Sequence, residues 1–340
     1  MRKSALLLQL FVFLISISAF AGVLDLIENA KKNNLTFLNA QINFEQSKMD
    51  YERNISLATT QKDLLSAKQS YLTANQDYQD AVLNHISLFF NKYVTYIKYL
   101  NSYQIALNNL ELAKKDLAKK QDLLKKGLVT QSDLNNAKIS VQENQLSLDQ
   151  VKYNLDNAKQ DLIKFLGTSD VPKIDFENVS LKITIPNINK LLEKSLEIQI
   201  AQNSLDIANF DFLNASSDTS AYDLVKYKNN VQIAQNNLNN VKNSTLDSFN
   251  NDIFTLKSLQ SKIEIQKSKL QLIRNDLSIT EQKYKKGLIS DTEYYNAQNN
   301  YYTNLSTYFD SVLDFVQIAV KLNYISEGDY AKIIKDIFKE

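Results

Sequence analysis

The sequence contains no cysteine, two prolines, five glycines and one histidine in 340 residues. The lack of cysteine excludes disulfides, cysteine catalysis and cysteine-ligated zinc, and it also excludes the lipid-carrying cysteine of a bacterial lipoprotein. Because glycine and proline are the main helix breakers, their scarcity predicts long uninterrupted helices. The formal net charge of +1 argues against a general nucleic-acid binder, which would carry a basic excess.

The one strongly apolar segment lies at the N-terminus. Arg2 and Lys3 precede an almost entirely apolar run over residues 5–20, and the sequence A-F-A at 19–21 has the form of a cleavage site. These features predict a secretory signal peptide over residues 1–21. The alternative is an uncleaved membrane anchor, but the run is shorter than the roughly 20 residues that span a bilayer. No later segment has an uncharged apolar run of that length, so we expect no transmembrane helix in the mature chain.

One short sequence occurs twice and organises the chain. KKGLVTQSD at residues 125–133 returns as KKGLISDTE at residues 285–293, an offset of 160. In both copies a glycine suited to ending a helix follows basic residues, which complement the C-terminal end of the helix dipole. Thr130 and Ser290 are good N-caps, with Asp133 and Glu293 three positions later, as in a capping box. We therefore predict two sharp helical hairpins related by duplication.

The same offset relates most of the two halves of the chain, for example Asn136-Ala137 and Asn296-Ala297. We place repeat 1 at residues 22–167, repeat 2 at residues 189–328 and a short tail at residues 329–340. The intervening residues 168–188 contain both prolines, and residues 179–185 alternate like a short strand. We expect an irregular linker there, with room for one strand.

Apolar residues recur three or four positions apart over most of the chain, which predicts an all-α fold. Residues 24–53 follow this pattern with a break near Asn33-Asn34, and residues 132–166 follow it without a break. The pattern over residues 61–126 has coiled-coil spacing and predicts a helix about 100 Å long. A hairpin of this length has little interior, so we do not expect one chain to close a core by itself. We expect lateral assembly into a cyclic oligomer that forms a bundle or a tube.

No group of residues has the pattern of a catalytic, cofactor or metal site. His85 lacks a second histidine or an acidic cluster at ligand spacing, so we interpret it as structural. The sequence has no phosphate-binding glycine loop and no Gly-x-Ser-x-Gly elbow, and we predict that the protein is not an enzyme. The aromatic residues around 89–103 and 294–309 could stack on a ligand, but their helical spacing favours packing between helices.

The repeated pattern Lys-Gly-Leu-Val/Ile-Thr/Ser, followed by an acidic residue and Asn-Ala, resembles the TolC-like outer-membrane efflux protein family. The tandem duplication and Leu166-Gly167 at a helix end strengthen this resemblance. It implies a TolC-like α-barrel protomer made of two tandem repeats of very long antiparallel helical hairpins. Its long helices would cover residues 61–126 and 221–286, with shorter helices over 24–53, 132–166, 188–213 and 290–327.

The resemblance also implies how the chain assembles and what it binds. In this family a homotrimer arranges twelve helical columns into a periplasmic tunnel, and the hairpin turns meet the adaptor protein of an inner-membrane pump. By position, the partner-binding tip residues here are Gly127, Leu128, Thr130, Gly287, Leu288 and Ser290. The acidic residues at the turns, Asp133, Asp291 and Glu293, could form a charged ring that gates the tip, although capping of the helices is the interpretation we favour.

The sequence departs from the family between the first short helix and the long helix of each repeat. Family members insert two membrane-spanning strands there, whereas this chain has only residues 54–60 and 214–220, and a transmembrane strand needs roughly 9–11 residues. We therefore expect little or no β-barrel. The resulting prediction is an exported efflux channel component of the outer membrane or periplasm of a double-membraned bacterium. The alternative is a structural coiled-coil spacer of the cell envelope without transport activity.

Overall fold

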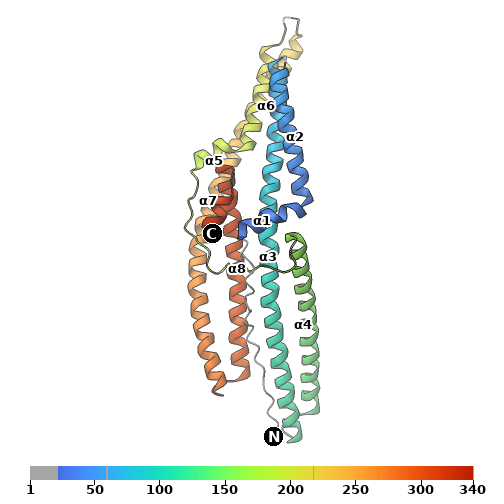
Figure 1. Ribbon diagram of the computed structural model, residues 1–340, viewed down its shortest axis with the longest axis vertical. Coiled ribbons are helices and arrows are strands. Elements are labelled where there is room, and N and C mark those ends of the chain that lie inside the picture. Colours follow the sequence, from blue (N-terminus) through green and yellow to red (C-terminus); the bar gives the residue numbers. More distant parts are fainter. Residues whose placement is uncertain (1–21, 59, 217, 340) are drawn as a thin grey trace.

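The computed structural model describes residues 22–58, 60–216 and 218–339, so the predicted signal peptide lies outside the described residues (Figure 1). The described part of the chain consists of helices, turns and loops without a strand, which confirms the all-α prediction. The helices are α1 (Val23–Ala30), the 3-10 turn η1 (Lys31–Asn33), α2 (Leu35–Leu57), α3 (Gln61–Lys125), α4 (Gln131–Leu166), α5 (Ile188–Lys194), α6 (Leu196–Leu213), α7 (Ala221–Lys285), α8 (Asp291–Glu327) and α9 (Ala331–Phe338). Within the described residues, no helix combines the length and the apolar character that crossing a membrane requires.

The helices form four columns that lie side by side along the long axis (Figure 1). The long helices α3 and α7 each make one column. Along the outer side of α3, α2 lies in the upper half and α4 in the lower half, while α6 and α8 occupy the space between α3 and α7. The ends of the α3–α4 and α7–α8 hairpins therefore lie at the same end of the molecule.

Two breaks divide the shorter helices. The predicted break near Asn33-Asn34 is confirmed, because η1 ends there and the Asn34 side chain caps α2 by accepting from the N–H of Phe37 at 3.2 Å. The helix expected over residues 188–213 is interrupted at Ser195, which the sequence pattern did not predict. Ser195 has an extended backbone, and its hydroxyl caps α6 by accepting from the N–H of Ile198 at 3.4 Å. This capping lets the chain change direction between α5 and α6.

The linker is irregular, as predicted, and the short strand for which residues 179–185 left room does not form. The N–H of Ser180 donates to the carbonyl of Ile337 at 2.7 Å, and the Gln260 side chain donates to the carbonyl of Leu181 at 2.7 Å. A strand needs a second strand for its ladder of hydrogen bonds, and here the neighbouring elements are helices. The linker instead crosses the columns as an irregular segment (Figure 1). Its own side chains Phe176 and Val179 are buried.

The main apolar core, which we call the equatorial core, lies where this linker crosses the columns. Helices α1 and α9, the linker and the middle parts of the columns bury their side chains there, including Ile27, Phe89, Phe90, Leu162, Phe176, Leu256, Phe315 and Ile334. Full burial of one such side chain stabilises the fold by about 1.5–3 kcal/mol. The expectation that one chain closes no core was wrong at this level, because α1, α9 and the linker cover the columns.

His85 connects α1 to α3 inside the equatorial core. Its Nε2–H donates to the carbonyl of Ile27 at 2.9 Å, and its Nδ1 accepts from the side-chain amide of Asn34 at 3.0 Å. The ring packs between the rings of Phe37 and Phe165. The structural interpretation of this histidine is therefore confirmed. Burial lowers the pKa of His85, and its bond to the Ile27 carbonyl offsets this effect only in part.

Acid should destabilise the fold through His85. Because its folded-state pKa lies below the ordinary value of 6.5, the neutral ring contributes fully above that pH. The contribution is lost as pH falls from 6.5 to the folded-state pKa, at up to about 1.4 kcal/mol per pH unit. Since the chain has one histidine, its NMR ring signals report this pKa directly. A His85→Gln variant should lack this part of the pH dependence in urea unfolding, and a folded-state pKa above 6.5 would contradict the explanation.

Candidate functional site: the hairpin ends and the seam between them

The two hairpin ends have the same backbone structure. Gly127 and Gly287 have φ angles of 69° and 71°, in the left-handed region that favours glycine. The N–H of Leu128 donates to the carbonyl of Leu123 at 3.0 Å, the N–H of Gly127 donates to that of Leu124 at 2.9 Å, and equivalent bonds close the second turn. This pattern is a Schellman motif. No atom lies within 4 Å of a Cβ added at either glycine, so the turn requires glycine for its conformation and not for space.

Capping boxes start both return helices, as predicted. The Thr130 hydroxyl accepts from the N–H of Asp133 at 3.2 Å, and the Asp133 carboxylate accepts from the N–H of Thr130 at 2.8 Å. Ser290 and Glu293 form the same pair of bonds at 3.2 Å and 2.8 Å. The backbone N–H groups are the main cause of the lowered pKa values of Asp133 and Glu293. Capping is thus a shown role of both carboxylates, and a role in gating stays a prediction.

Each hairpin end presents a leucine to solvent. Leu128 is 68% exposed and Leu288 is 69% exposed, and each follows two exposed lysines and the glycine of the turn. The structure therefore brings the six predicted tip residues together in two similar projections at one end of the molecule. The α3–α4 hairpin projects further than the α7–α8 hairpin (Figure 1).

Asp291 differs from the other two acidic residues of the turns. It pairs with Lys115 on α3, and the Tyr284 hydroxyl donates to the same carboxylate oxygen. Lys115 also lies over the rings of Tyr284 and Tyr295, 5.3 Å and 5.6 Å from their centroids. Partial burial disfavours the charge on Asp291, but the bonds from Lys115 and Tyr284 outweigh it and hold the pKa of this carboxyl below its ordinary value. This cluster attaches the second hairpin end to the side of α3.

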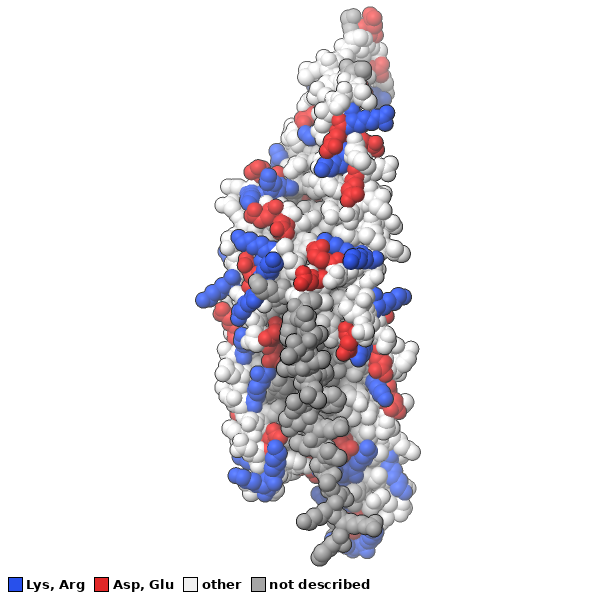
Figure 2. Space-filling view, viewed as in Figure 1, with Lys and Arg blue, Asp and Glu red and all other residues white. Residues whose placement is uncertain are grey.

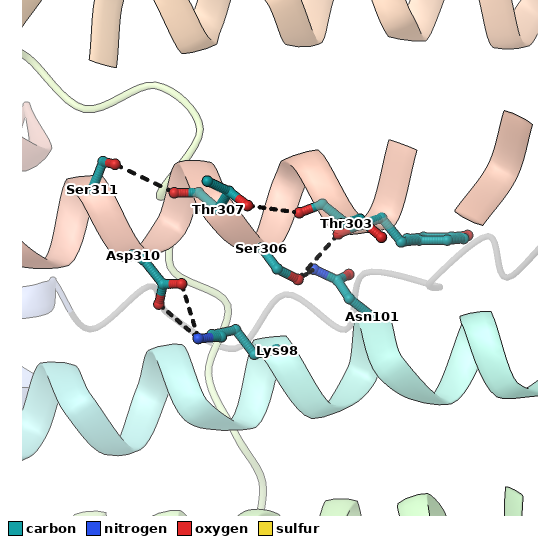
Figure 3. A network of polar contacts seen from close by, with 8 residues as sticks. Lys98, Asn101, Thr303, Ser306, Thr307, Asp310 and Ser311 are labelled. Atoms are coloured by element: carbon teal, nitrogen blue, oxygen red, sulfur yellow. Dashed lines mark hydrogen bonds and ion pairs between the residues drawn. The ribbon is translucent and has the colours of Figure 1, made fainter. Parts of the chain in front are cut away.

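Above this cluster, α3 and α8 meet through a row of polar side chains that we call the polar seam. Figure 3 shows Lys98 bound to both carboxylate oxygens of Asp310, at 2.8 Å and 2.9 Å, and Asn101 donating to the Ser306 hydroxyl at 3.0 Å. Further down, the Asn108 amide donates to Asn299 at 2.9 Å. Because Asn101 and Asn108 are 6% and 9% exposed, their amides depend on these partners in α8 rather than on water.

The polar seam has a heptad spacing. Asn101, Asn108 and Lys115 follow one another at seven-residue intervals on α3, and their partners Ser306 and Asn299 are also seven residues apart. Polar residues at such positions specify register at a cost in stability. The contact inside the first hairpin is instead apolar, with a cluster of Ala106, Leu110 and Leu148. Below the equatorial core, polar contacts through Asn101, Asn108 and Lys115 therefore join the two hairpins to each other.

The aromatic clusters pack between helices, as the spacing predicted. Tyr93 stacks on Phe176 with the ring centroids 5.3 Å apart, and Tyr284 stacks on Tyr294 at 4.2 Å. The Tyr93 hydroxyl accepts from the N–H of Ile174 at 2.6 Å, which attaches the linker to α3. Within the described residues, no group of acidic or histidine side chains is arranged to hold a metal ion.

Several solved structures have a similar architecture. The CmeC outer membrane channel from Campylobacter jejuni is similar with a TM-score of 0.58 and 14% identity, over 92% of this chain and 88% of that chain. The outer-membrane channel OprN is similar with a TM-score of 0.59 and 13% identity, over 90% and 89%. The fold is that of outer-membrane channels. The outer membrane protein VceC from Vibrio cholerae agrees, with a TM-score of 0.56 and 14% identity over 86% and 94%.

These comparisons confirm the TolC-like fold expected from the sequence resemblance. No family model and no curated protein sequence matches the chain. The similar structures are outer-membrane channels, and the lack of catalytic activity stays a prediction for this chain. The polar seam and the contact between Lys115 and Asp291 were missed at the level of sequence, although the seven-residue spacing of Asn101, Asn108 and Lys115 was a signal for them.

Replacing both Asn108 and Asn299 by leucine should raise the midpoint of thermal unfolding by several degrees, because apolar heptad positions are more stabilising than polar ones. Asn108→Leu alone should lower the free energy of unfolding by about 1–2 kcal/mol, because it leaves the Oδ1 atom of Asn299 without its donor, although the Asn299 side-chain N–H still donates to Asn109 at 2.8 Å. Asn135→Leu, on the exposed face of α4, is the control and should change little. Circular dichroism during heating measures all three, and a double variant less stable than the wild type would contradict the seam interpretation.

Proposed function

We propose that the chain is a TolC-like efflux channel component, a trimeric helical tunnel that works with a periplasmic adaptor protein and an inner-membrane pump. It would act in the periplasm or outer membrane of a double-membraned bacterium. The observation that carries this proposal is a layer of helical columns with the fold of outer-membrane channels and with an unpartnered apolar row on each of its two edges.

One edge of the layer is formed by α2 and α4. Helix α4 exposes Ile139, Leu146 and Tyr153 at seven-residue intervals, and each is more than half exposed. Helix α2 continues the row in the upper half with another heptad series, which is Leu35, Ile42 and Met49. Heptad rows of this kind pack against a second helix in coiled coils. Among the residues that the structure describes, these side chains are exposed and have no helix packed over them.

The opposite edge is formed by α7, which exposes Ile265, Leu272 and Ile279, again seven residues apart. The inner helices α3 and α8 carry less exposed apolar surface. In the part of the chain that the structure describes, α3 exposes one large apolar side chain, Leu88, and α8 exposes none. The apolar surface is thus concentrated where a neighbouring copy would lie. A contact between α7 of one copy and the α2–α4 edge of the next is heterologous, and three copies related by a rotation of a third of a turn would close it into a ring.

The heights of the two rows match. Asp291, the first residue of α8, pairs with Lys115 of α3. The start of α8 therefore lies level with Lys115, and the last ten residues of α3 lie below that level. Helix α4 runs back up along α3 from the first turn, and α7 runs down to the second turn. Counting residues along each helix from the level of Lys115 places Ile279 level with Leu146, and Leu272 level with Tyr153. These pairs are therefore the contacts that we expect between neighbouring copies.

The polar seam supports a tunnel end that opens. A polar contact between hairpins can be exchanged for water at a net cost of about 0.5–1.5 kcal/mol, whereas the equatorial core loses burial when it separates. The α7–α8 hairpin would then move away from α3 when Lys115 and Asp291 part. Among the three acidic residues proposed for the gate, Asp291 would take the changing contact, with Asp133 and Glu293 holding the turns as caps.

The ring can be tested by cross-linking, because the chain has no cysteine of its own. The double variant Leu146→Cys with Ile279→Cys should form disulfide-linked species on oxidation that stop at three chains in denaturing electrophoresis. The control Ser147→Cys with Ile279→Cys lies about 100° further round α4 and should cross-link weakly. Negative-stain electron microscopy of the cross-linked oligomer should show a hollow ring in end view. A solid rod would contradict the tunnel and favour the structural spacer.

The role of the tips can be tested separately. Leu128→Asp combined with Leu288→Asp should abolish co-purification of the adaptor and the pump from chemically cross-linked cells, because a buried carboxylate would replace an apolar contact. Leu213→Asp is the matched control, since Leu213 is 76% exposed at the other end of the molecule, and it should leave co-purification unchanged. Equal loss in both variants would rule out the tips as the binding site.

A further inference from the structure

The linker between the two repeats is attached to the first hairpin over its first half. Lys159 of α4 pairs with Asp170 at 3.3 Å, and the Tyr93 hydroxyl of α3 donates to the carbonyl of Pro172 at 2.9 Å. Further along the linker, the Phe176 side chain is 1% exposed and its ring stacks on the ring of Tyr93. These contacts fix the linker, as far as Phe176, on α3 and α4.

The next residue of the linker, Glu177, is bound by the second hairpin. Its carboxylate accepts from the Arg274 guanidinium of α7 at 2.6 Å, and its carbonyl accepts from the Tyr308 hydroxyl of α8 at 3.0 Å. The Arg274 guanidinium also donates to the Tyr301 hydroxyl at 2.9 Å and lies over the Tyr301 ring, 5.6 Å from its centroid. Glu177 therefore contacts both helices of the second hairpin directly after a residue that is fixed on α3.

The turn that carries Glu177 is stabilised by its own side chains. The Asp175 carboxylate accepts from the N–H of Glu177 and from the N–H of Asn178, each at 3.1 Å, and from the Asn178 side-chain amide at 2.8 Å. Aspartate side chains that bond the backbone two positions later form turns of this kind. Because the turn is held in this way, the linker has little slack between its attachments to the two hairpins.

The residue type at position 274 fits this contact. The cations of the chain, drawn in blue in Figure 2, are almost all lysines, and Arg274 is the one arginine in residues 54–340. A planar guanidinium bonds a carboxylate and a hydroxyl while it stacks on an aromatic ring, which an ammonium group does less well. At the equivalent position of the first hairpin, Lys114 pairs with Glu111 of its own helix. Duplication alone therefore does not explain Arg274.

The ion pair of Arg274 and Glu177 lies level with the polar seam, because Tyr301 lies between the seam residues Asn299 and Ser306 on α8. The two charged side chains are 57% and 40% exposed. An exposed ion pair adds little stability and is weakened by salt. It can therefore open without unfolding the equatorial core.

We infer that residues 175–178 form a clasp that holds the α7–α8 hairpin against α3, and that Arg274 must leave Glu177 before this hairpin can tilt. With the clasp closed, the hairpin is held at the levels of both Tyr301 and Tyr308, and two levels of attachment prevent a tilt. With the clasp open, the remaining pivot is Tyr308, which is 1% exposed in the equatorial core. The part of α8 below this pivot is a lever about 26 Å long, so a tilt of about 10° moves its end by about 5 Å.

The clasp is a second lock on the opening of the tunnel end, beside the pair of Lys115 and Asp291. In this role it rests on the proposed channel function. Both locks lie within one chain, however, so the distance between its two hairpins measures them whether or not the oligomer is a tunnel.

The test is the distance between two spin labels in the cysteine-free chain, attached to Ala118→Cys of α3 and Gln282→Cys of α7, which are both exposed positions. Labelled chains are mixed with an excess of unlabelled chains, so that each oligomer carries one labelled copy. Asp291→Asn alone and Arg274→Gln alone should keep the wild-type distance, because the other lock still holds the hairpin. Asp291→Asn combined with Arg274→Gln should add a population that is longer by about 5 Å.

Two further variants separate the clasp from a general effect of charge. Glu177→Gln with Asp291→Asn should give the same longer population, since it removes the other partner of the ion pair. Lys267→Gln with Asp291→Asn is the matched control, because it removes another exposed cation of α7, and it should keep the wild-type distance. The clasp would be overturned if Asp291→Asn alone moved as far as the double variant, or if the double variant lacked the longer population. A hollow ring in electron microscopy would leave the channel proposal standing in either case.

Discussion

The equatorial core is the constraint on which the rest of the structure depends, because within residues 22–58, 60–216 and 218–339 only this cluster of buried apolar side chains joins all four columns. Phe89 and Phe90 of α3 belong to the same buried cluster as Phe315 of α8, and Leu162 of α4 and Leu256 of α7 also belong to it. The short elements that interrupt the long helices, α1, α9 and the linker, are what cover this core. Away from it the columns pack in a single layer, so their contacts depend on the sequence of each interface.

Those interfaces are of two kinds. Within the first hairpin the contact is apolar, around Leu110 and Leu148, and the hairpin should behave as one unit. Between the hairpins the contact is polar, through Asn101 and Asn108, and it ends at Lys115. Polar heptad positions set the register of α3 against α8 without making the contact difficult to separate. The equatorial core would then be the fixed point about which the lower ends move.

The local features of the hairpins could be predicted from sequence because their signals are local. Gly127, Thr130 and Asp133 lie within seven residues of sequence. A glycine that ends one helix, followed at once by a capping box that starts another, predicts a sharp helical hairpin. Heptad spacing indicates a helix with a packed face, but it does not say which helix meets that face. The polar seam was missed for this reason, as was the covering of the core by α9. The alternation in residues 179–185 gave a false strand, because the signal for a strand is local while its partner is not.

The arrangement of the exposed apolar rows explains why assembly should give a tunnel rather than a solid bundle. A layer whose apolar rows lie on its edges, on α4 and α7, buries them by closing on itself and not by stacking face to face. In the proposed trimer, twelve columns spaced about 10 Å apart on a circle would lie at a radius of about 19 Å. Subtracting about 5 Å for half the thickness of a helix leaves an open interior about 14 Å in radius, which side chains from the surrounding helices cannot fill. The same edges that leave the single chain incomplete would therefore determine that its closed form is hollow.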